Sequence, residues 1–101
     1  MNAEDVQISH KILSSVAIAL LGEVVPSLRA IAIDWGECRI RTVSYYDGAP
    51  TEDDLYLAEI IGMELREDFG DDWSIRTEVT RRDTPTKMEP LRAWAFKRKE
   101  I

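Results

Sequence analysis

The spacing of the apolar residues switches between helical and strand-like periods along this chain, and this alternation constrains the fold more than any other feature. Residues 12–24 carry apolar side chains three and four positions apart, which is the period of an amphipathic helix. Acidic residues precede this stretch, where a helix dipole favours them, and Pro26 follows it. We therefore expect a first helix over residues 4–24.

Two β-rich runs follow, at residues 28–35 and 38–46, and they are separated by a connection that contains a turn glycine. Such runs around a short glycine-containing connection are typical of a hairpin. Cys38, at the start of the second run, is interpreted as a small buried residue.

The segment DGAP, residues 47–50, predicts a turn, and Thr51 suits the N-cap of a second helix. Asp54, three residues later, completes a capping-box pattern. The helix dipole stabilises the acidic side chains of the first turn. Gly70 is placed to end this helix. Its predicted buried stripe is Leu55, Ala58, Ile61, Gly62, Leu65 and Phe69.

Residues 73–81 alternate between apolar and polar side chains, and residues 91–98 form a last β-rich run, which we expect to pair with residues 73–81 as a second hairpin. The order α-β-β-α-β-β predicts one α+β domain over residues 1–101. We expect a four-stranded, mainly antiparallel sheet with two helices on one face. The other sheet face is expected to be exposed and partly apolar, around Tyr45, Trp94 and Phe96.

Negative charge is concentrated in residues 45–72, which hold ten of the nineteen acidic residues and one basic residue, Arg66. The net charge of −6 argues against nucleic acid or an anionic membrane as the main partner. Basic residues near the C-terminus are interpreted as outward-facing strand positions and a solvated tail. The apolar run 12–21 is too short to span a bilayer and lacks the signals of a secretory leader, so we expect a cytoplasmic protein.

Catalytic chemistry finds little support in the sequence. A single histidine and a single cysteine exclude a Cys/His zinc cluster and leave no imidazole pair. The carboxylate groups at residues 52–54 and 68–72 lack the spacing of a calcium loop. We therefore expect no enzyme, no catalytic residues, no metal and no cofactor.

The stretch SYYDGAPTEDDLYLAEIIGMELREDF, residues 44–69, resembles small bacterial immunity proteins of contact-dependent growth inhibition and related polymorphic toxin systems. The resemblance lies in the aromatic strand end, the Asp-Gly-x-Pro-Thr-Glu-Asp segment and the amphipathic helix that closes on Asp-Phe. It implies a non-enzymatic inhibitor that binds a cognate toxin domain, the C-terminal domain of a large secreted effector.

Many such toxin domains are nucleases with a basic cleft, and an acidic helix face complements a cleft of that kind. The residues expected to bind the toxin are Tyr46, Glu52, Asp53, Glu59, Glu67, Asp68, Asp71, Asp72 and Trp73. Two alternatives stay open. One is an α+β scaffold or homo-oligomeric subunit that uses the spare sheet face, and the other is an enzyme with a carboxylate metal site.

Overall fold

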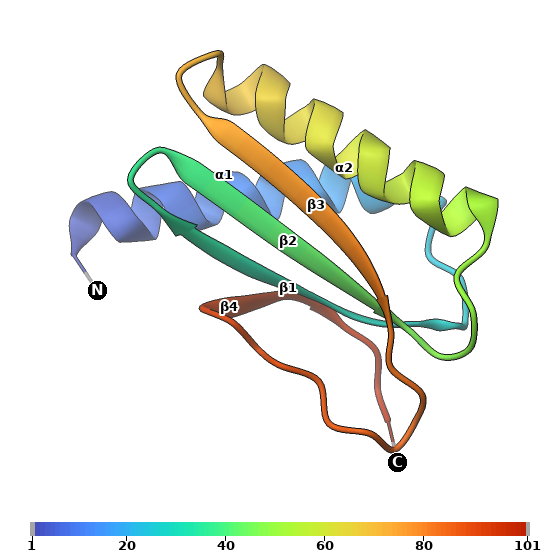
Figure 1. The fold of residues 1–101 in the computed structure, drawn as a ribbon. Coiled ribbons are helices and arrows are strands. Elements are labelled where there is room, and N and C mark those ends of the chain that lie inside the picture. Colours follow the sequence, from blue (N-terminus) through green and yellow to red (C-terminus); the bar gives the residue numbers. More distant parts are fainter. Residues whose placement is uncertain (1, 101) are drawn as a thin grey trace.

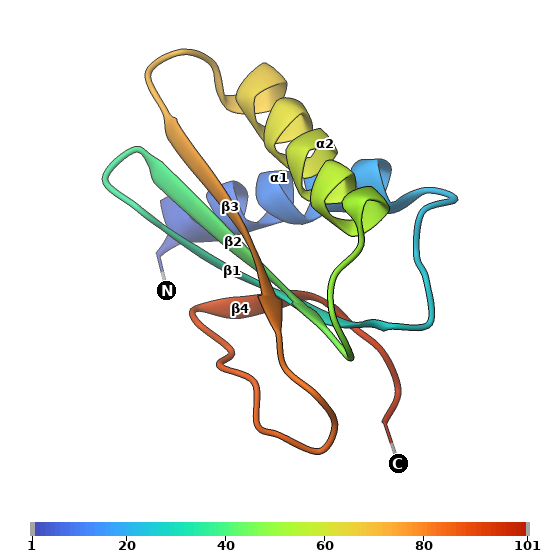
Figure 2. The ribbon, with the colours of Figure 1, turned by 45° about the vertical axis from the view of Figure 1, so that its right-hand side comes forward.

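The computed structural model describes residues 2–100, in which two helices pack against a four-stranded sheet (Figure 1). Figure 2 shows both helices on the same side of the sheet. The elements are α1 (Ala3–Leu20), β1 (Leu28–Gly36), β2 (Arg39–Tyr46), α2 (Glu52–Phe69), β3 (Ser74–Arg81) and β4 (Ala93–Lys97). The predicted α+β class, with two helices and four strands, is therefore confirmed.

The sheet has the strand order β3-β2-β1-β4, and it is mixed. β1 pairs antiparallel with β2 and with β4, whereas β2 and β3 are parallel. The prediction of a mainly antiparallel sheet is wrong because α2 returns the chain to the end of the sheet where β2 begins. A crossover through a helix produces a parallel pair. β3 and β4, which were expected to be neighbours, lie at opposite edges.

The first helix begins where the sequence indicates and ends early. The Asn2 side chain caps it by accepting a hydrogen bond from the Asp5 backbone N–H at 2.8 Å. The helix stops at Leu20, not at residue 24, and Gly22 follows with φ +75°. Leu21 consequently lies outside the core and is 76% exposed.

The second helix has the predicted capping box. The Thr51 hydroxyl accepts from the Asp54 N–H at 3.2 Å, and the Asp54 carboxylate accepts from the Thr51 N–H at 2.9 Å. Gly70 ends the helix with φ +83°. The buried stripe differs from the prediction at one position, because Leu57 is buried whereas Leu55 is 52% exposed. The helix is rotated so that its stripe centres on Leu57, Ile61 and Leu65.

The helix-facing core contains side chains from both helices and from β1 and β2, among them Ile12, Val16, Ile31, Ile33 and Ile61. The opposite sheet face is also covered in part, which contradicts the expectation of an exposed apolar face. Met88, in the connection between β3 and β4, packs on Val43 and Tyr45. The Tyr45 hydroxyl donates to the Glu89 carbonyl at 3.0 Å.

A β-bulge in β4 separates its two aromatic residues, because Ala95 is the extra residue between the pairs that Phe96 and Trp94 form with β1. The register shifts between Ile31 and Ala32, so that Phe96 packs with the helix-facing core while Trp94 packs on the other face. The β1–β2 turn also differs from expectation. Cys38 is exposed there with φ +60°, next to Glu37 at φ +50°, because β2 begins one residue later, at Arg39.

A buried arginine ties the C-terminal residues to the sheet. Arg29 of β1 is 3% exposed and makes two hydrogen bonds to the Glu100 carboxylate, at 2.8 and 2.9 Å. Arg29 also donates to the carbonyls of Arg82 and Thr86, and Arg98 donates to Glu100 at 2.9 Å. This part of the basic tail is therefore held in place, contrary to the prediction of a solvated tail.

Within residues 2–100, neither helix is long and apolar enough to cross a membrane.

Candidate functional site

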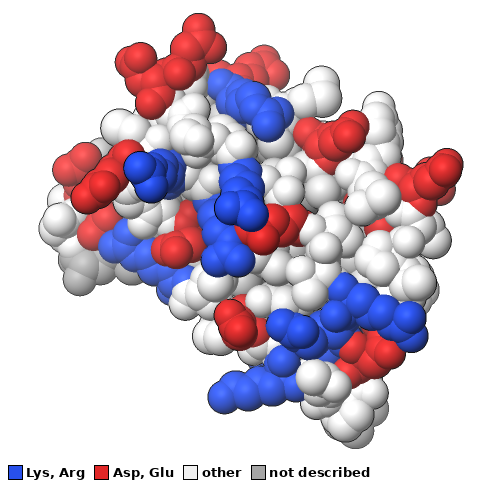
Figure 3. Space-filling view, in the orientation of Figure 1, with Lys and Arg blue, Asp and Glu red and all other residues white. Residues whose placement is uncertain are grey.

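The acidic residues selected from the sequence are all exposed in the structure. They lie on α2 and in the turn that follows it: Glu52, Asp53, Glu59, Glu67, Asp68, Asp71 and Asp72. Figure 3 shows red acidic side chains along the upper and right-hand rim of the molecule, the region that α2 and its C-terminal turn occupy in Figure 1. The helix thus presents carboxylates to solvent over its whole length.

These carboxylates form two groups and not one patch. An 18-residue helix is about 27 Å long, so the acids of its first turn and those of the turn after it lie at opposite ends. Glu59 lies between the two groups. Asp68 is partly committed to the fold, because its carboxylate accepts a hydrogen bond from the Ser15 hydroxyl of α1.

The two aromatic candidates have different environments. Tyr46 is 1% exposed, so its ring lies in the core and cannot reach a partner. Burial, together with the nearby Asp54 carboxylate, raises the pKa of Tyr46 to about 12. Trp73 is half-buried against Phe69, with 4.8 Å between the ring centroids, and its remaining surface adjoins Asp71 and Asp72 in the chain.

Sequence reasoning missed three apolar residues on the solvent side of α2. Leu55, Tyr56 and Met63 are 52%, 60% and 62% exposed. Tyr56 and Met63 occupy the side of the helix opposite the buried stripe, interspersed with Glu52 and Glu59, and Leu55 lies at the edge of that side. The signal in the sequence is that Tyr56 and Met63 are seven residues apart and belong to no buried stripe of helical period.

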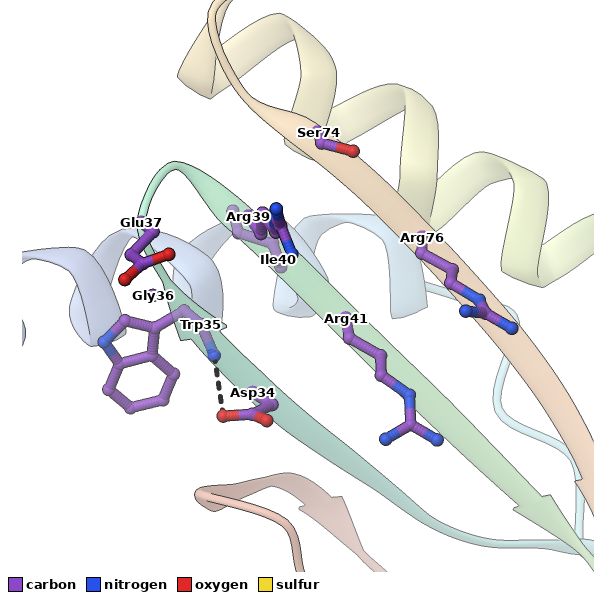
Figure 4. A pocket seen from close by; sticks show the side chains of 9 residues that line it. All are labelled: Asp34, Trp35, Gly36, Glu37, Arg39, Ile40, Arg41, Ser74 and Arg76. Carbon is purple, nitrogen blue, oxygen red and sulfur yellow. Dashed lines mark hydrogen bonds between the residues drawn. The ribbon is translucent and has the colours of Figure 1, made fainter.

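A second surface feature is the hollow on the helix-free face of the sheet (Figure 4). Arg39 and Arg41 of β2 and Arg76 of β3 line it together with Asp34 of β1. Arg41 forms a hydrogen-bonded ion pair with Glu78, and the Arg76 Nε lies 3.7 Å from the same carboxylate. The Arg41 guanidinium lowers the pKa of Glu78. The charges of this hollow therefore largely compensate one another.

Side chains that could hold a metal ion do not come together in the described part of the chain. Among residues 2–100, no three His, Cys, Asp or Glu side chains are close enough to hold one metal ion. The surface chemistry that the arrangement offers is the charge and apolar area of α2. That chemistry is suited to binding another macromolecule.

Comparison with known proteins gives a family match. A protein-family model described as MafI2 immunity protein matches residues 9–100, which include every strand, all of α2 and most of α1. The match extends on both sides of residues 44–69, the stretch that carries the resemblance seen in the sequence. No curated protein matches the chain.

Proposed function

The chain belongs to the MafI2 immunity protein family, and we propose that it protects a cell by binding and neutralising a cognate toxin domain. The match over residues 9–100 is the observation that carries this proposal. It makes the chain an immunity protein of a toxin system. The finer features are ours: residues 1–101 act as a single domain, in the cytoplasm, by binding and without catalysis.

The proposed partner is the C-terminal domain of a large secreted effector, as in contact-dependent growth inhibition and related polymorphic toxin systems. We further propose that this toxin domain is a nuclease. A nuclease needs a basic cleft to hold phosphates, and the acidic side of α2 has the opposite charge. Complementary charges increase the rate of encounter and disfavour wrong partners.

The proposed contact includes the exposed acids at both ends of α2 and the free surface of Trp73. Tyr46 is no longer included, because it is buried. The scaffold alternative loses its main support, since that reading relied on an exposed apolar sheet face and Met88 covers part of this face. The net charge of −6 continues to favour a basic protein over nucleic acid or a membrane as partner.

The experiment first asks whether the reading frame directly upstream encodes a large secreted protein, and then co-expresses this chain with the C-terminal domain of that protein as the toxin. Cells that carry both should grow, and cells that carry the toxin alone should not. A triple variant, Glu59→Lys, Glu67→Lys and Asp71→Lys, should remain folded because all three positions are exposed, and it should protect less well.

A matched control reverses three exposed glutamates outside α2 and its turn: Glu23→Lys, Glu37→Lys and Glu89→Lys. This control changes the net charge by the same amount, so protection by it separates a local contact from an effect of total charge. If wild-type chain gives no protection, the proposed function fails. If the folded α2 triple variant protects as well as wild type, only the acidic-surface part fails.

A further inference from the structure

We propose that Leu55, Tyr56 and Met63, which we call the α2 strip, are the anchors that hold the cognate toxin. The α2 strip would insert into an apolar pocket of the toxin that is bordered by lysine or arginine side chains. This inference rests on the proposed function and names the contact that provides most of the affinity. The acids around the strip then serve mainly to steer the encounter.

The geometry of α2 places these residues together. Tyr56 and Met63 are two helical turns apart, about 10.5 Å along the axis, and Glu59 lies between them. Leu55 is four residues before Glu59, so these two side chains are neighbours on the helix surface, and Leu55 lies at the edge of the side that carries Tyr56 and Met63. Each of the three apolar side chains is more than half exposed, whereas the opposite side of the helix provides Leu57, Ile61 and Leu65 to the core. The α2 strip therefore contributes little to the fold.

The residue types suit an anchor. Tyrosine is enriched among the few residues that dominate binding energy, because its large ring loses little conformational freedom when it is buried. Methionine adapts to irregular apolar pockets. Single exposed apolar residues are common on protein surfaces, but the α2 strip has three on one helix, grouped around Glu59.

The negative charge around the α2 strip favours a basic toxin over a second copy of this chain as the partner. A twofold interface joins one patch to a copy of itself, so a second copy of this chain would bring the net negative charge of this side of α2, with Glu52 and Glu59, against the same net negative charge. Like charges opposed in this way disfavour association. A toxin with basic residues around an apolar pocket pairs with the same carboxylates. The acids and the apolar side chains thus both point to a basic protein partner.

The outward side of α2 is too small to form a whole interface, so the α2 strip would be one part of a larger contact. The outward side of α2 is about 27 Å long and about 10 Å wide, or about 270 Å² in projection. A standard interface buries about 800 Å² on each partner. The remaining contact must extend beyond the helix, and the turn with Asp71 and Asp72 adjoins its C-terminal end.

The test measures binding kinetics with the catalytically inactivated toxin domain from the upstream reading frame. Tyr56→Ala and Met63→Ala should leave the fold intact, because alanine favours an exposed helical position. Together they should weaken binding at least about 30-fold, mainly through faster dissociation. Glu59→Gln should instead slow association at low salt and reduce its salt dependence. Leu21→Ala, at an exposed leucine outside α2, is the control and should bind like wild type.

The outcomes separate this inference from the proposed function. If wild type binds the toxin and the Tyr56→Ala/Met63→Ala variant binds equally well, the anchors are elsewhere and the inference is overturned while the function stands. Loss of binding in Leu21→Ala alone would also overturn it, in favour of the end of α1. A wild-type dimer that becomes monomeric in the double variant would overturn it in favour of self-association. If wild type does not bind at all, the proposed function itself fails.

Discussion

Replacing Glu100 by glutamine should destabilise this protein far more than its position near the C-terminus suggests. Arg29 is 3% exposed and relies on the Glu100 carboxylate for two of its hydrogen bonds, at 2.8 and 2.9 Å. The amide of glutamine would offer one acceptor and turn an N–H₂ group toward a guanidinium N–H. The variant would therefore leave a buried positive charge without its counter-ion.

The expected cost follows from the burial of Arg29. Removing one partner of a buried ion pair costs about 3–5 kcal/mol. The Glu100 side chain is 23% exposed, so water can partly replace it, and we expect about 3 kcal/mol, the low end of that range. For a domain of this size, 1 kcal/mol corresponds to about 4–8 °C in Tm, so the midpoint should fall by about 12–24 °C.

The pH dependence gives a second measurement. The Arg29 guanidinium, with help from Arg98, lowers the pKa of Glu100 from 4.5 to about 2 in the folded protein. The carboxylate therefore stabilises the fold fully above pH 4.5, and this contribution disappears as the pH falls from 4.5 toward 2. Wild type and Glu100→Gln should differ most at neutral pH and converge in acid.

Denaturant unfolding at several pH values, with equal slopes, measures both effects. Glu23→Gln makes the same chemical change at an exposed glutamate and should alter the free energy of unfolding by no more than about 0.5 kcal/mol. A Glu100→Gln variant as stable as this control at pH 7 would refute the argument. A large loss that persists unchanged at pH 2 would show that the carboxylate charge is not its cause.

Two further changes test other features of the fold. Thr51→Ala removes the N-cap hydroxyl of α2 and should lower the free energy of unfolding by about 0.5–2 kcal/mol, and an unchanged denaturation midpoint at unchanged slope would mean that the capping box contributes nothing. Tyr46→Phe removes a buried hydroxyl that has no hydrogen-bond partner among residues 2–100, so it should raise the free energy of unfolding by about 1 kcal/mol and leave toxin protection intact. A large loss of stability would indicate that this hydroxyl is satisfied in solution.

Local features were predictable from the sequence because their causes lie within a few residues. The Thr51 capping box and the Gly70 helix end each depend on neighbours in the chain, and both are present. The exposure of Glu52, Glu59 and Glu67 follows from helical period. The same period did not show whether Leu55 or Leu57 is buried, because the two are only two residues apart. In the structure Leu57 packs in the core and Leu55 is exposed.

Long-range pairings were not predictable in this way. Adjacent β-rich runs suggested that β3 and β4 form a hairpin, yet the connection over residues 82–92 is longer than the usual hairpin loop and places β4 at the other edge. This connection also covers part of the second sheet face, so Tyr45 and Tyr46 are both buried although they point to opposite faces. Arg29 pairs with Glu100, which is 71 residues away in the sequence, so no local pattern indicates this pair.

The two sides of α2 have different roles: one side packs on the fold, and the other is the proposed contact with the toxin. The first-turn acids of α2 and the capping box fix where the helix begins, and Leu57, Ile61 and Leu65 fix how it packs. Apart from Glu52 of the first turn, the residues on the outward side take no part in either role, and exposed substitutions usually change stability by no more than about 0.5 kcal/mol. The proposed anchors and acids can therefore change with the toxin while the core remains the same. On this argument, specificity for one toxin resides in the outward side of α2, and folding resides in the side that faces the sheet.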